Sequence, residues 1–195
     1  MKKNLFALFA IIGVFFAFKP ATDVYTVDVS KSKIEWIGRK VTGQHAGELK
    51  LATGTLSSSG KTLTGGSFVI DMTSISNTDL DAGSAQKLLG HLKSEDFFST
   101  EKNPTANFNI TNIKSVGADK VTITGNLTIK GITNEVAFPA TVRQKGNILV
   151  AVANGVKIDR TKFDIKYGCK SFIDGIGDKA IDNEFELNIN LVAIK

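Results

Sequence analysis

The sequence predicts an all-β fold of antiparallel strands, completed by one short helix and a covering loop. About ten short runs alternate apolar and polar residues, which is the pattern of strands with one buried face. Turn-forming stretches such as SSSGK, VGADK and QKGN separate them, as between strands joined by hairpins. Residues 79–93 alone lack this pattern. Alternation leaves two architectures open, a closed barrel and a two-sheet sandwich, since each has one inward face per strand.

The N-terminal stretch MKKNLFALFAIIGVFFAFKPA has the form of a signal peptide, with two lysines before an unbroken apolar run. The run covers residues 5–18, about 14 residues, whereas a membrane-spanning helix needs about 20. We therefore expect residues 1–21 to be a cleaved signal peptide, with Ala17 as an alternative end. Residues 22–195 would form one exported domain, periplasmic or secreted, with no transmembrane segment.

Composition fits a single globular domain, because 42% of the residues are hydrophobic and 22% are charged. Removal of residues 1–21 would lower the formal charge from +5 to +2, and basic and acidic residues alternate in the remainder. Such a chain lacks the basic stripe of a nucleic-acid-binding protein, so nucleic acid is not an expected partner. Cys169 is the one cysteine, which excludes an internal disulfide and a cysteine-cluster zinc site. We interpret it as a small filler in a strand or turn.

The first strands are expected in YTVDV, KIEWIG and ELKLATGTL, where the alternation is weak, and in SFVIDM, where Phe68, Ile70 and Met72 share one face. The intervening GTLSSSGKT is similar to a phosphate-binding loop, but it has one residue too many between its glycines. It also lies between two strands instead of before a helix. A hairpin turn at SSSGK explains it better.

Residues 79–93 predict the helix, with Leu88, Leu89 and Leu92 at helical spacing and Ser84 as the expected N-cap. A polar connector follows that carries two adjacent rings, Phe97 and Phe98. Large rings leave water only where apolar surface receives them, so the connector is expected to fold over a hydrophobic interior.

The later strands alternate more clearly. VTITGNLTIKG places Val121, Ile123, Leu127 and Ile129 on one face. Gly125 shares that face, where it could bend the strand, admit a neighbouring backbone or leave room for a ligand. Other strands are expected in NFNI, EVAFPATV, ILVAV, KFDIKY and EFELNINL.

Residues with catalytic or metal-binding potential are few and scattered. His45 and His91 are far apart and belong to no metal-binding motif, and no GxSxG nucleophile motif is present. His45 is expected at a strand edge or turn and His91 at the end of the helix. We therefore expect no enzyme, no metal and no cofactor. An enzyme acting on a bound lipid would need a polar pair inside the fold, for which His45, His91 and Asp96 are the candidates.

Three ordered motifs give a resemblance to a known family. HLKSEDFFSTEKNPTANFNI resembles the signature region of the YceI-like family, in which an H-L-[KR]-S-x-D-F-F-like run precedes a K-x-P turn and a strand. GNLTIKGITNEV resembles that family's G-x-L-T-[IL]-x-G-V-T-x-x-V, and RTKFDI its R-x-x-F-x-I. The chain departs from the family at Leu49, where a serine is usual, and by one inserted residue nearby, which leaves the identity of a ligand open.

The resemblance implies a lipocalin-like antiparallel β-barrel, elongated, whose apolar interior holds a long isoprenoid or quinone-like lipid without catalysis. The connector rings would then belong to the wall or lid of the tunnel, or pack beneath it, and Pro104 would fix the turn into the next strand. The expected lipid-contacting residues are Phe68, Ile70, Phe97, Phe98, Phe108, Ile110, Ile123, Leu127, Ile129, Phe138 and Phe163.

A rival hypothesis uses the same strands. If the inward residues interdigitate at crystal-like density, the chain is a solidly packed β-domain that acts as a stress-related or surface interaction module. The expected partners are thus a long-chain lipid or, under the rival, another protein, and the sequence leaves a homodimer open.

Overall fold

The computed structural model describes residues 21–169 and 177–195. The predicted signal peptide, apart from its last residue, lies outside these ranges. The strands are β1 (Thr22–Val27), β2 (Lys33–Lys40), β3 (Gly43–Ser59), β4 (Thr62–Asp71), β5 (Thr105–Ser115), β6 (Lys120–Ile129), β7 (Ile132–Lys145), β8 (Ile148–Asp159) and β9 (Ile181–Ile194). The helices are α1 (Ala82–Lys93) and the short 3-10 helices η1 (Met72–Ser74), η2 (Arg160–Phe163) and η3 (Gly177–Lys179).

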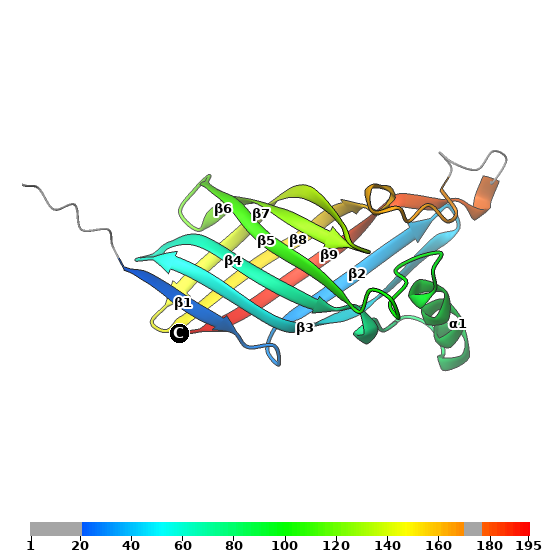
Figure 1. Cartoon of the computed structure of the whole chain (residues 1–195), viewed down its shortest axis with the longest axis horizontal. Coiled ribbons are helices and arrows are strands. Elements are labelled where there is room, and N and C mark those ends of the chain that lie inside the picture. The colour runs from blue at the N-terminus through cyan, green and yellow to red at the C-terminus, as the bar shows by residue number, and fades with distance from the viewer. Residues whose placement is uncertain (1–20, 170–176) are drawn as a thin grey trace, which may run out of the picture.

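The strands form one antiparallel sheet that closes into a barrel (Figure 1). The order is β1-β3-β2-β9-β8-β7-β6-β5-β4, and pairing of β3 with β4 closes the ring. The long strand β3 pairs with β2 through residues 43–49 and with β1 through residues 55–59. Strands β1 and β2 therefore share one position end to end, which gives an eight-stranded barrel. The predicted lipocalin-like barrel is confirmed, and the sandwich is excluded.

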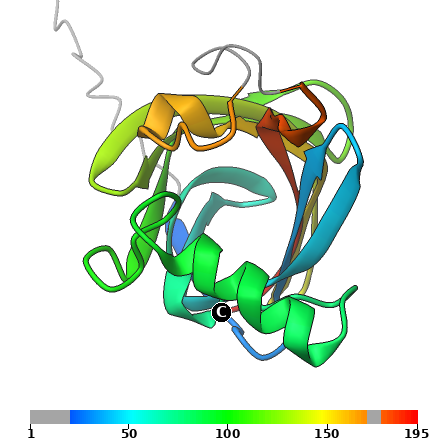
Figure 2. The ribbon, with the colours of Figure 1, turned by 90° about the vertical axis from the view of Figure 1, so that its right-hand side faces the viewer.

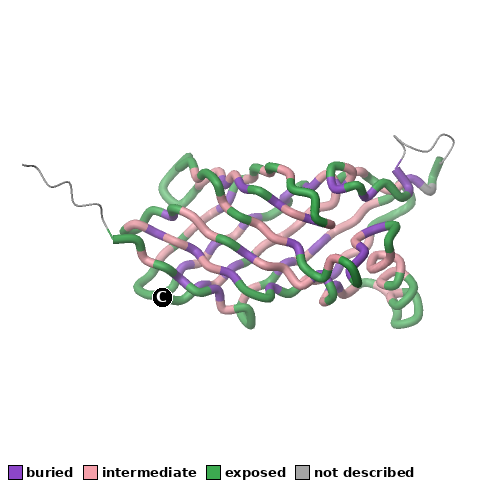
Figure 3. Tube along the Cα trace, viewed as in Figure 1, coloured by how far each residue is buried: buried purple, intermediate pink, exposed green. Residues whose placement is uncertain are grey.

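Alternation of buried and exposed residues follows the predicted periods along the strands (Figure 3). On β6, Ile123, Leu127 and Ile129 are buried, while polar residues alternate with them. A Cβ at Gly125 would lie 2.5 Å from the Phe108 ring and 2.6 Å from the carbonyl oxygen of Asn109. Of the three roles considered for this glycine, the structure shows close approach of the neighbouring strand.

The expected N-cap of the helix is wrong. Helix α1 begins after Asp81, whose carboxylate accepts hydrogen bonds from the backbone amides of Gly83 and Ser84 at 3.0 and 3.1 Å. A carboxylate at that position satisfies two of the amides that a helix start leaves unpaired. Ser84 is therefore inside the first turn. At one end of the barrel, α1 and the connector after it lie across part of the opening (Figure 2), which we call the mouth.

The strand expected in KFDIKY is also wrong. Residues 160–163 form η2, capped by the Asp159 carboxylate, which accepts from the backbone amide of Thr161 at 3.0 Å. The side chain of Arg160 donates to the carbonyl oxygens of Ile165 and Tyr167 at 2.9 and 2.8 Å. These bonds curl the segment back on itself, so it cannot extend into a sheet.

Strands β7 and β8 pair through residues 141–145 and 148–152 and then diverge toward the mouth. Pro139, two residues before Thr141, has the position whose amide would face β8, and proline has no amide hydrogen to donate. On the other strand, Gly155 (φ 65°) lies in a bulge of the β8 pairing with β9. Both interruptions occur at the same level of the barrel. Between this level and the mouth, β7 and β8 are not paired with each other.

Within residues 21–169 and 177–195, none of the helices has the length and apolar character needed to cross a bilayer.

Candidate functional site

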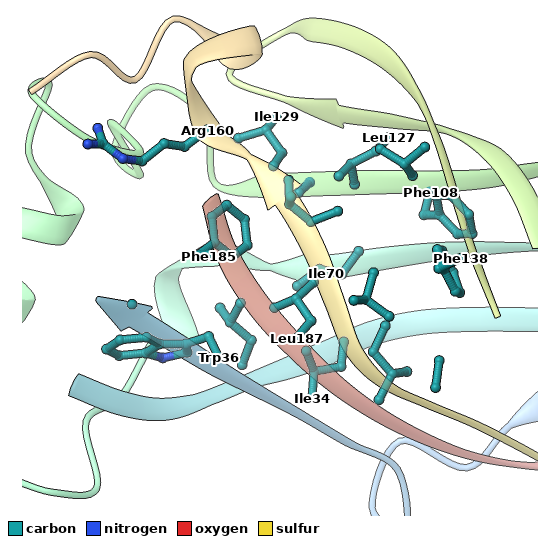
Figure 4. A pocket seen from close by; sticks show the side chains of 18 of the residues that line it. Ile34, Trp36, Ile70, Phe108, Leu127, Ile129, Phe138, Arg160, Phe185 and Leu187 are labelled. Atoms are coloured by element: carbon teal, nitrogen blue, oxygen red, sulfur yellow. The ribbon is translucent and has the colours of Figure 1, made fainter. Parts of the chain in front are cut away.

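The barrel encloses a cavity of about 340 Å³ that extends inward from the mouth (Figure 4). Its wall is almost entirely hydrocarbon and is built from β2 to β9, with Leu88 and Leu92 of α1 closing part of the mouth. The inward positions of the strands supply it, because alternate side chains point to the barrel interior. Arg39, Lys40, His45, Arg160, Asp182 and Glu184, the charged or titratable residues of the wall, come from segments near the mouth.

Most residues predicted from the sequence lie on this wall. They are Phe68, Ile70, Phe97, Phe98, Phe108, Ile110, Ile123, Leu127, Ile129 and Phe138. Phe163 does not line the cavity. It is 1% exposed and packs in the core from η2, since its segment is a helical turn and not a strand. Contact of any of these residues with a ligand stays a prediction.

The sequence reasoning missed several wall residues, above all Trp36, whose strand alternates weakly. Its indole Nε1 donates to the carbonyl oxygen of Ser76 at 3.0 Å, so the ring is fixed at the mouth end of the wall. Ile34, Phe185 and Leu187 also line the cavity (Figure 4). The last two belong to EFELNINL, whose alternation predicts an inward face for them, although they were not among the expected lipid-contacting residues.

The two connector rings, Phe97 and Phe98, line the cavity close to α1. Phe97 is buried and lies against the rings of His91 and Tyr167, with centroid separations of 4.9 and 5.5 Å. Phe98 meets Phe185 of β9 edge-on at 6.3 Å. Because both line the cavity, the polar connector carries two rings for the reason the sequence suggested. It folds over an apolar interior.

At the mouth, Arg160 links the loop after β8 to the start of β9. The side chain is 4% exposed. In addition to the two carbonyl oxygens named above, it donates to those of Ile181 and Asp182 at 3.1 and 2.9 Å. Its guanidinium also lies 5.9 Å from the centre of the Phe97 ring. Burial lowers the pKa of this guanidinium from its usual value, yet four carbonyl acceptors satisfy it. The role of Arg160 is therefore structural, since its guanidinium is occupied by hydrogen bonds to the backbone.

Each of the two histidines lies beside a different carboxylate. His45 Nδ1 lies 3.0 Å from Asp79, and His91 Nε2 lies 3.4 Å from Asp96. Burial alone would raise the pKa of Asp79, but hydrogen bonds from His45, the Ala46 amide and Asn77 outweigh it and lower that pKa. Among the described residues, no three metal-ligating side chains come together. The arrangement offers apolar contact area and fixed mouth residues, and its chemistry is that of binding hydrocarbon.

Comparison with known families gives a match over nearly the whole described chain. The sequence profile described as the YceI-like domain matches residues 25–193, so the resemblance found in the sequence is confirmed. Among relatives, the protein YceI of Escherichia coli O157:H7 is 38% identical over 73 residues, which cover 37% of each chain. A UPF0312 protein of Pseudomonas paraeruginosa is 47% identical over 57 residues. That stretch covers 29% of each chain, so the chain matches well under two thirds of these relatives' length.

Solved structures of similar fold support the barrel. BcnA of Burkholderia cenocepacia superposes with a TM-score of 0.68 at 22% identity, over 86% of this chain and 99% of that one. A domain from Saccharophagus degradans described as polyisoprenoid-binding superposes with a TM-score of 0.66 at 17% identity, over 87% and 97%. At these identities the likeness concerns the fold.

Proposed function

Because this chain belongs to the YceI-like family and encloses an apolar cavity, we propose that it binds a long-chain isoprenoid or related lipid, such as a quinone, and does so without catalysis. It would carry or store the lipid after export to the periplasm or the medium. The predicted signal peptide is the basis for the export.

The cavity is the observation that carries this proposal. Protein interiors normally pack at the density of organic crystals, with few voids larger than a water molecule. A void of about 340 Å³ with a hydrocarbon wall attracts apolar ligands, because water gains few hydrogen bonds there. The rival hypothesis of a solidly packed interaction module does not account for it.

The wall also bears on selectivity. Burial of each methylene contributes roughly 0.8 kcal/mol, so a hydrocarbon chain binds through its area and needs few polar contacts. The titratable wall residues lie near the mouth, which is where a polar head group would remain. We therefore expect related chains to compete with one another. The polyisoprenoid-binding description of the Saccharophagus domain is in keeping with this ligand class.

The test is native mass spectrometry of the mature protein purified from its own cell envelope, followed by organic extraction. A stoichiometric adduct that extracts as a long-chain isoprenoid is the expected result, and it would name the cargo. A bare protein mass, with no uptake of added quinone or polyprenol, would overturn the proposal.

The absence of catalysis has its own test. The mature protein, and variants with alanine at His45, His91 or Asp96, are incubated with the extracted lipid, and the products are analysed by mass spectrometry. Unchanged lipid in every sample is expected. Turnover that one of these variants loses would make the protein an enzyme.

A further inference from the structure

The cavity ends partway along the barrel, at a layer of leucines. Leu56 and Leu191 line it. Farther from the mouth, at the end of the barrel that holds the C-terminus (Figure 1), the interior is filled by buried side chains such as Leu149 (1% exposed) and Ala193 (0%). Neither belongs to the described cavity wall. The barrel is thus hollow from the mouth as far as these leucines and is filled by side chains beyond them.

A hydrogen bond crosses this filled end of the barrel. The side-chain amide of Gln144 on β7 donates from Nε2 to the hydroxyl of Tyr25 on β1 at 2.7 Å. These strands are separated in the sheet by β8 and β9, so the bond spans the barrel interior. Both residues point inward, and Tyr25 is 1% exposed.

This pair is a chemical barrier as well as a steric one. The Oε1 atom of Gln144 is buried and has no hydrogen-bond partner in the described part of the chain. A hydrocarbon that advanced past Leu191 would separate Gln144 from Tyr25 and leave further buried polar groups unpaired, which is unfavourable. We call Tyr25, Leu56, Gln144 and Leu191 the floor of the cavity.

The cavity volume indicates how much chain fits above the floor. An engineered protein cavity of about 150 Å³ holds one benzene molecule, so the volume of about 340 Å³ here has room for on the order of a dozen carbons. Resting on the proposed function, we propose that the barrel binds a chain segment of that length, with the floor as the determinant of length. Longer chains would leave their remainder at or outside the mouth.

A chain-length series tests this with linear primary alcohols of about eight to about twenty carbons, each competing with a fluorescent apolar probe on the delipidated mature protein. Since a buried methylene contributes about 0.8 kcal/mol, affinity should rise about fourfold per added carbon and level off near a dozen. Leu56→Ala deepens the floor and should move the plateau by on the order of three carbons. Leu88→Ala removes the same atoms at the mouth and should leave the plateau unchanged.

The outcomes are distinguishable. Affinity that keeps rising to the longest alcohol would overturn the length limit while leaving lipid binding intact. A plateau that Leu56→Ala does not move would overturn the assignment of the floor, and Leu56→Val, with a smaller shift expected, serves if the alanine variant does not fold. Binding of no alcohol and no probe would remove the proposed function itself.

Discussion

The indole Nε1 of Trp36 donates a 3.0 Å hydrogen bond to the backbone carbonyl of Ser76, which ties the cavity wall to the segment leading into α1. Gly47 makes room for the bond. A Cβ at that position would lie 2.7 Å from the indole nitrogen and would overlap the Ser76 carbonyl oxygen. The tryptophan, the glycine and the serine segment therefore fit together as one unit at the mouth.

Gly47→Ala should disrupt this unit. The added methyl group has no room against the Ser76 backbone, and overpacking of this kind costs about 1–3 kcal/mol or more. Chemical denaturation monitored by tryptophan fluorescence measures the loss. Gly65→Ala is the matched control, since nothing lies within 4 Å of a Cβ there. Equal stability of the two variants would contradict the account.

Arg160→Lys should destabilise the loop after β8. A lysine keeps the charge but cannot reach four carbonyl oxygens with a planar fork, and each buried acceptor left unpaired costs about 1–3 kcal/mol. We expect a loss of about 3 kcal/mol in the free energy of unfolding. Arg143→Lys, in an exposed pair with Asp119, should cost under about 1 kcal/mol. If Arg160→Lys lowers the free energy of unfolding no more than Arg143→Lys does, the hydrogen bonds of Arg160 do not stabilise the loop.

Asp28 should contribute acid-sensitive stability to the turn between β1 and β2. The Ser30 hydroxyl and the Lys31 ammonium donate to its carboxylate at 2.6 and 2.9 Å, and they lower its pKa from 3.8 to about 2. Because the folded-state pKa is the lower one, this stability is present above pH 3.8 and is lost as the pH falls toward about 2.

Thermal unfolding of the wild type, Asp28→Asn and Ser30→Ala between neutral pH and pH 2 checks this. At neutral pH the wild type should unfold at a higher temperature than either variant. This difference in unfolding temperature should shrink as the pH falls from 3.8 toward about 2. An advantage that persists unchanged at the lowest pH would rule out Asp28 as its source.

Phe98→Ala should open the mouth. The ring lines the cavity and packs edge-on against Phe185, so its removal lowers the barrier for ligand exit. Stopped-flow dissociation of a bound fluorescent apolar probe should become about tenfold faster, which corresponds to about 1.4 kcal/mol. Phe98→Leu restores apolar bulk and should recover most of the wild-type rate. Equal rates in all three proteins would place the exit path elsewhere.

The sequence predicted those strands in which apolar and polar residues alternate, because the alternation itself shows which face is buried. Ile123, Leu127 and Ile129 alternate with polar residues because one face of β6 meets the interior, and Phe97 and Phe98 are conspicuous in a polar connector because an apolar surface receives them. These are local signals, readable without knowledge of the neighbours.

Features that depend on distant partners could not be predicted. The strand expected in KFDIKY is lost because the Arg160 side chain, which lies outside the motif, binds the carbonyl oxygens of Ile165 and Tyr167 within it. The same side chain binds those of Ile181 and Asp182 on the distant strand β9. Likewise, closure of the barrel depends on β3 pairing with β1, β2 and β4, a register that no single run encodes. The hydrogen bond of Trp36 joins residues 40 positions apart.

The most direct test of the central claim fills the cavity. Ala153 is buried on its wall, and Ala137 is an exposed residue of β7, so Ala153→Phe and Ala137→Phe add the same ring inside and outside the barrel. Both variants are titrated with a fluorescent apolar probe after circular dichroism has shown that they fold. Binding weakened at least about tenfold by the inner ring, and unchanged by the outer one, is the predicted result. Equal binding by both variants would contradict a ligand held within the barrel.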